Sequence, residues 1–180
     1  MYALLGADAQ HHTDIVNTET FWTAFANNIN IFANALVWKT NADNCVSHSD
    51  FWNKIWSYTN LANGIISDSA AMTGIAASTV AMTAIAASSA VMTMIAASTV
   101  AMTAIAASAV AMTVIAGSSI AMTEIEASNI ACNAITASSI AIQAFIDNIS
   151  TFSSLGYYAS NTTIDYGKYN GKKLFMLNGT

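Results

Sequence analysis

Few side chains in this sequence could carry out chemistry, and none of them lies in a catalytic or metal-binding pattern. His11 and His12 stand near Asp14 in a polar N-terminal segment, where an exposed pair of histidines is the favoured interpretation. Glu124 and Glu126 are two residues apart, so on a helix they point to different sides and form no carboxylate pair. The sequence also lacks a glycine-rich phosphate loop and a nucleophile elbow. We therefore predict no enzyme, no metal site and no cofactor.

Sulfur-containing side chains are better explained as core residues than as ligands. Cys45 and Cys132 are far apart in the sequence, which does not fit a metal or redox motif, and both fall on apolar positions of the repeat described next. A buried thiol of this kind behaves as a small hydrophobic group. The regularly spaced methionines could suggest a copper site, but methionine at repeat spacing is typical of a hydrophobic core.

A ten-residue repeat extends through most of the chain. Its clearest copies are residues 80–89 and 100–109, and Met recurs at every tenth position from Met72 to Met122. Ile recurs in the same way from Ile55 to Ile135. A repeat of this regularity predicts an array of stacked units whose first and last members are atypical.

Two apolar columns, three residues apart, are predicted to form the core of the array. They can be followed from about residue 22 to residue 155, with aromatic residues replacing Met and Ile towards both ends. The predicted core residues are Trp52, Ile55, Met72, Ile75, Met82, Ile85, Met92, Ile95, Met102, Ile105, Met112, Ile115, Met122 and Ile125.

The repeat length predicts helices that are broken once in every unit. Ala, Met and Ile favour helix, and a unit shows no strand-like alternation. Ten residues at about 100° each fall about 80° short of three turns, so the apolar stripe would wind around one continuous helix. A break at a serine avoids this problem, because a serine side chain can cap the next short helix. The predicted caps are Ser78, Ser88, Ser98, Ser108, Ser118 and Ser128.

The expected fold class is all-α, a decapeptide-repeat solenoid of short helices with a small C-terminal β-hairpin. A bundle of long helices is the alternative. We expect an N-terminal arm over 1–20, a helical region over 21–155 and a tip over 156–180. Within the helical region, an aromatic-rich start (21–66), with longer helices over 19–39 and 49–66, precedes a regular block (70–146).

The C-terminal tip is predicted to be a hairpin spanning residues 164–177. Asn170 and Gly171 form a strong type I′ turn signal between two apolar runs. With Tyr166 and Tyr169, these residues are the candidate tip of the molecule.

Composition argues against two further classes of protein. The net charge is −5 and there is no basic patch, which disfavours binding to nucleic acid. Residues 94–116 are uncharged, but they carry Ser or Thr in every unit and lack flanking basic residues, which disfavours membrane insertion. The N-terminus lacks the basic start and long apolar core of a signal peptide, so none is expected.

A ladder of threonines directly follows the methionines and suggests an alternative function. Regular threonine on an alanine-rich surface resembles the surface of ice-binding proteins, although such a threonine can also bond a carbonyl one turn back. The ladder consists of Thr73, Thr83, Thr93, Thr103, Thr113 and Thr123.

The repeat as a whole resembles a known style of viral sequence. The phrases Ser-Thr-Val-Ala-Met-Thr-Ala-Ile-Ala-Ala-Ser (98–108) and Ser-Ser-Ile-Ala-Met-Thr-Glu-Ile (118–125) are similar to degenerate repeats in structural proteins of tailed bacteriophages. The resemblance covers about residues 49 to 150. It implies a virion component, such as a tail, fibre or collar protein, made in the host cytoplasm. The implied partners are other virion proteins, further copies of the chain and the host surface, and no functional residue is carried over.

Overall fold

The computed structural model describes residues 17–27, 49–160 and 173–177. These residues are mostly helical, and the helices are short and closely similar. In chain order they are α3 (Glu19–Ala26), α6 (Ser49–Trp56), α7 (Thr59–Ile66), α8 (Ser69–Ala76), α9 (Thr79–Ala86), α10 (Ser89–Ala96), α11 (Thr99–Ala106), α12 (Ala109–Ala116), α13 (Ser119–Glu126), α14 (Asn129–Thr136), α15 (Ser139–Asp147) and α16 (Ile149–Ser154). Two strands follow, β1 (Tyr157–Ser160) and β2 (Lys173–Leu177).

The predicted break in every unit is confirmed between Thr59 and Asp147. A helix of eight or nine residues begins at every tenth position, so the alternative of a bundle of long helices is wrong for this part of the chain. The longer helix expected over 49–66 is also wrong. It divides into α6 and α7 at Ser57 and Tyr58, where Tyr58 has an extended backbone.

Each break has the same local cause. Ser78, for example, has an extended backbone (φ −103°, ψ 117°), and its hydroxyl accepts a hydrogen bond from the amide of Ala81 in the first turn of α9. The predicted serines all occupy this N-cap position, as does Ser138, and Asp68 does the same for α8. The cap satisfies an amide that has no partner within its own helix. Consecutive helices consequently meet at a sharp bend, 99° between α8 and α9.

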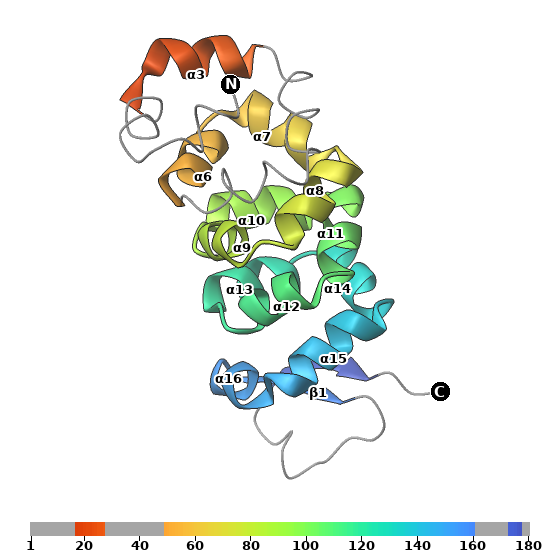
Figure 1. The fold of residues 1–180 in the computed structure, drawn as a ribbon. Coiled ribbons are helices and arrows are strands. Elements are labelled where there is room, and N and C mark those ends of the chain that lie inside the picture. The colour runs from red at the N-terminus through yellow and green to blue at the C-terminus, as the bar shows by residue number, and fades with distance from the viewer. Residues whose placement is uncertain (1–16, 28–48, 161–172, 178–180) are drawn as a thin grey trace.

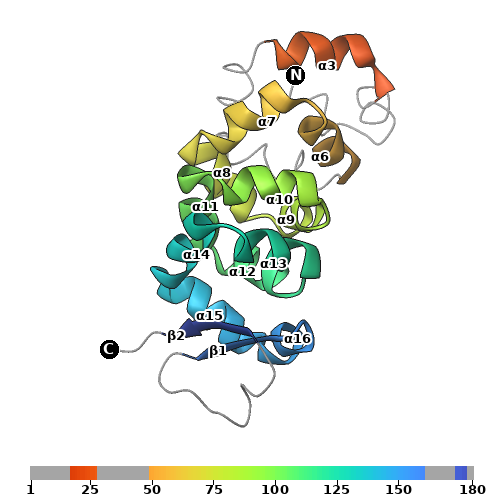
Figure 2. The same ribbon diagram turned by 180° about the vertical axis from the view of Figure 1, so that it is seen from behind.

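The bends bring each helix from α6 to α12 against the helix three units further along the chain. Three stacks result: α6, α9, α12 and α15; α7, α10 and α13; and α8, α11 and α14. The array therefore advances by one coil in about thirty residues. Figures 1 and 2 show this advance as a continuous change of colour from α6 to α15 along the length of the molecule.

The core runs along the inside of these coils. All of the predicted core-column residues are at most 1% exposed. The alanines that flank them, such as Ala101 and Ala106, are also buried, at 0% and 2% exposed. Four positions in each helix from α8 to α12 therefore face inward, and the small side chain at one or two of them allows the helix backbones to approach closely.

The serine caps also connect successive coils. The hydroxyl of Ser108 donates a hydrogen bond of 2.6 Å to the carbonyl oxygen of Ala76, the last residue of α8. Equivalent bonds of 2.5 to 3.2 Å run from Ser98 to Ile66, Ser118 to Ala86, Ser128 to Ala96, and Ser138 to Ala106. Each serine thus satisfies an amide at the start of one helix and a carbonyl at the end of another.

Aromatic side chains replace Met and Ile at the two ends of the array. Near the N-terminal end, Trp22 is fully buried and stacks on Tyr58, and Trp52 stacks on Trp56. Near the C-terminal end, Phe145 stacks on Phe152, with ring centroids 4.6 Å apart, and Phe152 stacks in turn on Tyr157. Large rings are suited to these places because a terminal unit has a neighbour on one side only.

The hairpin expected over 164–177 lies largely outside the described residues and stays a prediction, and the two described strands pair with each other in another way. Gly156, with φ of 88°, ends α16 and directs the chain into β1. β2 lies in the segment expected to be the second arm of the hairpin, but it pairs with β1 in parallel, and β1 precedes the predicted hairpin. Parallel strands need a long connection and cannot be joined by a two-residue turn. The expected turn and tip, Tyr166, Tyr169, Asn170 and Gly171, lie outside the described residues.

Replacing Ser108 by alanine should destabilise the protein more than replacing Ser88 by alanine. Loss of the cap costs about 1 kcal/mol in either variant. Ser108→Ala also removes the bond to Ala76, worth about 1 kcal/mol more. Among the described residues, Ser88 caps α10 without a carbonyl partner three units earlier. Urea unfolding followed by circular dichroism measures both variants, and equal losses would contradict the linking role of Ser108.

Replacing Ile105 by alanine should destabilise the array by about 2–5 kcal/mol, because the deleted side chain leaves a cavity in a close-packed core. Ile105 is fully buried. Thr103→Ala, two residues away on the exposed side of the same helix, is the matched control and should change stability by about 0.5 kcal/mol or less. The same unfolding experiment compares them, and similar losses in the two variants would contradict the assignment of the core.

Candidate functional site

The threonine ladder does not form one surface. Because consecutive helices bend by about 100°, neighbouring threonines of the ladder lie on different stacks. Thr73 and Thr103 belong to α8 and α11, Thr83 and Thr113 to α9 and α12, and Thr93 and Thr123 to α10 and α13. Each side of the array therefore carries two threonines of the ladder, one coil apart.

Several of these threonines bond to their own helix. The hydroxyls of Thr73, Thr83 and Thr123 each donate to the carbonyl oxygen four residues earlier, at 2.8 or 2.9 Å. This is the back-bonding that threonine commonly makes in a helix. The hydroxyl of Thr93 has one proton to donate and lies 2.8 Å both from the carbonyl oxygen of Ser89 and from the carboxylate of Glu124. These hydroxyls consequently have a local structural partner, although they remain exposed.

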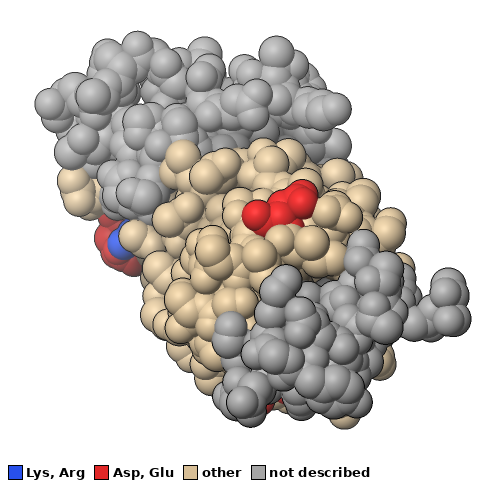
Figure 3. All heavy atoms as spheres, turned by 90° about the horizontal axis from the view of Figure 1, so that it is seen from below, with Lys and Arg blue, Asp and Glu red and all other residues tan. Residues whose placement is uncertain are grey.

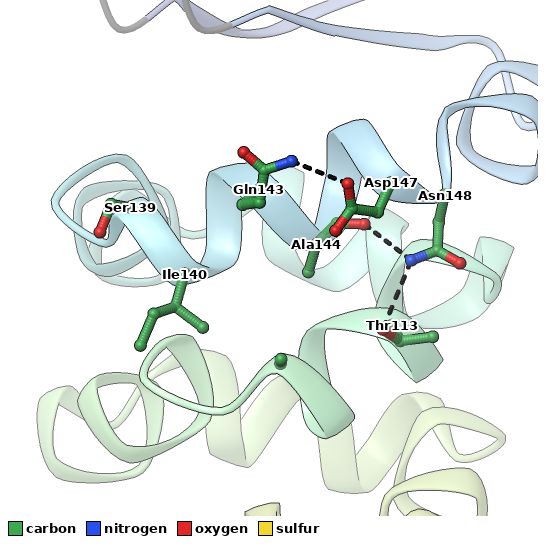
Figure 4. Close-up of a pocket in the computed structure, with 8 residues that line it drawn as sticks. Thr113, Ser139, Ile140, Gln143, Ala144, Asp147 and Asn148 are labelled. Atoms are coloured by element: carbon green, nitrogen blue, oxygen red, sulfur yellow. Dashed lines mark hydrogen bonds between the residues drawn. The ribbon is translucent and has the colours of Figure 1, made fainter.

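An open hollow in the described surface lies between α12 and α15, near the C-terminal end of the array (Figure 4). It has a volume of about 460 Å³. The amide nitrogen of Gln143 donates to a carboxylate oxygen of Asp147 at 2.7 Å. The amide nitrogen of Asn148 donates to the carbonyl oxygen of Ala144 at 2.7 Å and lies 3.4 Å from the hydroxyl of Thr113. Ser139 and Ile140 border the other end of the hollow.

This arrangement can form hydrogen bonds but offers no pair of groups for acid–base catalysis. Among the described residues, Asp147 is the only ionisable side chain that lines the hollow. Sequence analysis did not single out this place. The sequence does mark this place by a departure from the repeat. Gln143, Asp147 and Asn148 occupy positions where most central units have Thr, Ala and Ser.

Glu124 connects two adjacent coils, at the stack that contains α10 and α13. Its carboxylate on α13 accepts bonds from two hydroxyls of α10, at 2.5 Å from Ser89 and 2.8 Å from Thr93. These two hydrogen bonds lower the pKa of Glu124, because they stabilise its charged form. Glu124 thus acts as a structural clamp.

Glu126 joins the repeat array to the segment that follows it. In earlier units the equivalent position holds a buried residue such as Ala106 or Ala116, whereas Glu126 is exposed. Its carboxylate accepts a hydrogen bond of 3.0 Å from the hydroxyl of Tyr157, which begins β1. Burial and this bond to a carboxylate together raise the pKa of Tyr157 to about 12.

A third polar contact holds α3 against the start of the array. The ammonium group of Lys54 lies 2.7 Å from one carboxylate oxygen of Glu19, and the hydroxyl of Tyr58 donates to the other. These bonds lower the pKa of Glu19 and raise the pKa of Lys54 and of Tyr58. An exposed pair of this kind adds little stability but fixes an orientation.

Cys132 is only half-buried, so the prediction of a fully buried thiol is wrong at this position. Its sulfur lies 3.4 Å from the carbonyl oxygen of Ile125. Burial, and then the charge of Glu126, raise the pKa of the thiol, which disfavours the reactive thiolate. Cys45 lies outside the described residues.

Within the described ranges, no group of three or more His, Cys, Asp and Glu side chains could hold a metal ion. His11, His12 and Asp14 lie outside these ranges. No described helix is by itself long and apolar enough to cross a membrane. Four pairs of consecutive helices meet that test of length and composition only when taken together across their bends.

The contact between Tyr157 and Glu126 should stabilise the protein up to about pH 10 and lose this effect as the pH rises through about 12. The folded pKa of Tyr157 lies above its ordinary value of 10.0, so deprotonation favours unfolding over this interval. The measurement is the difference in melting temperature between the natural protein and Tyr157→Phe from pH 8 to pH 12. The difference should shrink above pH 10, and a difference that stays constant to pH 12 would contradict this assignment.

The chain was compared with models of protein families, with curated proteins and with solved structures, and nothing in any of the three comparisons matches it.

Proposed function

We propose that this chain is a non-enzymatic structural or attachment component of a tailed-phage particle, such as a tail, fibre or collar protein. The observation that carries the proposal is that the hydroxyl groups of the array bond to the backbone of its helices. The serine hydroxyls that could serve as nucleophiles instead cap helices and connect coils, as Ser108 does for α12 and α8. The resemblance of the repeat to phage structural sequences supplies the biological setting.

The finer architecture that we propose is a solenoid closed by aromatic residues at both ends. Each helix in the central block is held by its chain neighbours and by the helices three units before and after it. Such an array is held together along its length by neighbouring contacts, so it is suited to act as a spacer. The buried Trp22 and Phe152 support the closure of the two ends.

The two ends differ in a way that suits attachment. One end holds α3 through the ion pair between Glu19 and Lys54, and the other continues into β1 through the contact between Tyr157 and Glu126. We propose that one end binds the particle and that the other is displayed or binds a further protein or the host surface.

The distribution of the threonines does not favour the alternative of ice binding. An ice-binding surface of the expected kind would bring the threonines of the ladder together on one flat side. Here they lie on three stacks, and Thr83 and its equivalents bond to their own helices. We therefore test ice binding only if the following experiment contradicts the proposal.

Immunogold electron microscopy of purified phage particles should show label at one fixed site on the tail, collar or capsid, using an antibody against residues 156–180. The same particles treated with pre-immune serum are the control, and mass spectrometry of the particles checks that the chain is present. Unlabelled particles that also lack the chain would contradict the proposal. Thermal hysteresis of the natural protein, compared with a Thr93→Leu and Thr103→Leu double variant, would then be the next measurement.

A further inference from the structure

An unpaired polar group lies at the end of α6, near the start of the array. The indole nitrogen of Trp56, the last residue of α6, is buried and has no hydrogen-bond partner among the described residues. Trp56 as a whole is only 8% exposed. A buried donor without an acceptor is rare in folded proteins, because it has given up its bond to water and gained none. Trp56 therefore marks a place where an added acceptor would be stabilising.

The serine bond between coils is also missing at this place. Where the carbonyl belongs to an alanine, the bond from the capping serine measures 2.5 to 2.7 Å, and it lengthens to 3.2 Å where the carbonyl belongs to Ile66. Ser88 is the cap that corresponds to Trp56, and in the described part of the chain its hydroxyl does not donate to the carbonyl oxygen of Trp56. The bond is thus lost as the side chain at this position grows from alanine to isoleucine to tryptophan. A hydroxyl proton and a carbonyl oxygen are left over at this joint.

An open hollow of about 210 Å³ lies at the same joint, between the end of α6 and the start of α10. Trp56 and Ser88 both line it, and Val91 and Met94 add apolar surface. One water molecule needs only about 10–15 Å³ of such space, so the hollow is large enough for a small organic molecule. Because the indole nitrogen is itself covered, its bond to such a molecule requires a small rotation of the ring towards the hollow.

The charge of the hollow favours a neutral ligand. It borders the last turn of α6, where a helix dipole is negative, and the first turn of α10, where it is positive. The equivalent hollow beside Ala96 and Ser128 differs, because Glu124 lines it and the serine bond is made there. The described surface visible in Figure 3 is also mostly uncharged, with isolated acidic and basic groups. The described lining residues of the hollow at Trp56 are all uncharged: Asn53, Trp56, Ser57, Ser88, Ala90, Val91 and Met94.

We propose that this hollow binds a primary carboxamide on a short apolar chain. The carbonyl oxygen of the ligand accepts from the indole nitrogen of Trp56 and from the hydroxyl of Ser88, and its amino group donates to the carbonyl oxygen of Trp56. A carboxamide suits all three groups because it combines two donors with an oxygen that can accept twice. The site goes beyond the proposed function and does not depend on it, because binding is measured with the purified chain in the absence of any particle.

Propionamide, which carries the side chain of glutamine, is the probe for the site. With isotope-labelled tryptophan, NMR shows one indole signal for each of the four tryptophans, and Trp56→Phe identifies the signal of Trp56. Propionamide should shift this signal until it saturates. Butanone, which has a methyl group in place of the amino group, and propionate should each bind about tenfold more weakly, since neither can donate. No saturable shift with propionamide, or equal binding of butanone, would overturn the proposal.

Ser88→Gly tests the site, and Ser78→Gly is its matched control. Both serines cap a helix, but Ser88 lines the hollow and Ser78 does not. Glycine is itself a good N-cap residue, so both variants should fold, which circular dichroism and the melting temperature check. Ser88→Gly should weaken propionamide binding by about fivefold, and so should Trp56→Phe when the signals of the ligand are followed instead. Equal affinity of the two glycine variants, or full affinity of Trp56→Phe, would overturn the assignment of the site.

A free small amide and a glutamine side chain of a partner protein present the same carboxamide. A peptide with blocked ends and one glutamine between two glycines distinguishes these sources, and the same peptide with methionine in place of glutamine is the control. Tighter binding of the glutamine peptide than of propionamide supports a partner protein, and weaker binding supports a free amide. Equal binding of the glutamine and methionine peptides would overturn the role of the carboxamide.

Discussion

The array depends on the hydrogen bonds that the hydroxyl of the capping serine makes to two different helices. A helix of eight residues leaves several backbone amides and carbonyls without partners, and these unpaired groups are a large fraction of so short a helix. Ser108 satisfies an amide of α12 and a carbonyl of α8 at once. The same side chain therefore ends one helical segment, starts the next and fixes the distance between two coils. Serine suits both tasks because its hydroxyl donates and accepts, and its small size lets the coils approach.

The stacking of each helix on the helix three units away follows from the bend at these caps. This stacking determines which residues lie together on one side of the protein. Residues that are neighbours in the repeat, such as Thr93 and Thr103, lie on different sides, whereas residues thirty positions apart lie on the same side. A regular column in the sequence therefore becomes three shorter rows on the molecule. This geometry removes the single threonine surface and places exposed apolar residues such as Val80, Val110 and Ile140 on one side instead.

The distribution of polar and charged side chains along the chain is consistent with the structural role proposed above. In the central units, hydroxyl groups serve the backbone, and the uncharged sides offer no acid or base. Ionisable side chains of the described residues gather towards the two ends, where Glu19 and Lys54 hold α3 and Glu126 holds Tyr157. The Ser caps end in the same region, because Asn148 precedes α16 without making a side-chain cap. Some departures from the repeat, such as Glu126, thus lie where the array meets other parts of the protein, whereas Glu124 joins two helices within the array.

The sequence by itself determined the short helices, their capping serines and the inward-facing Met and Ile columns. It could do so because these features depend on spacing and on contacts within a few residues, as in Ser78 and Ala81. Only the tertiary structure decided which helices stack, because a bend of about 100° cannot be read from the residue types on either side of it. For the same reason it alone showed that Gln143 and Asn148 border a hollow beside Thr113, and that β2 pairs with β1 in parallel. These contacts join residues at least thirty positions apart or depend on the course of the chain between them, and local propensity does not specify such pairings.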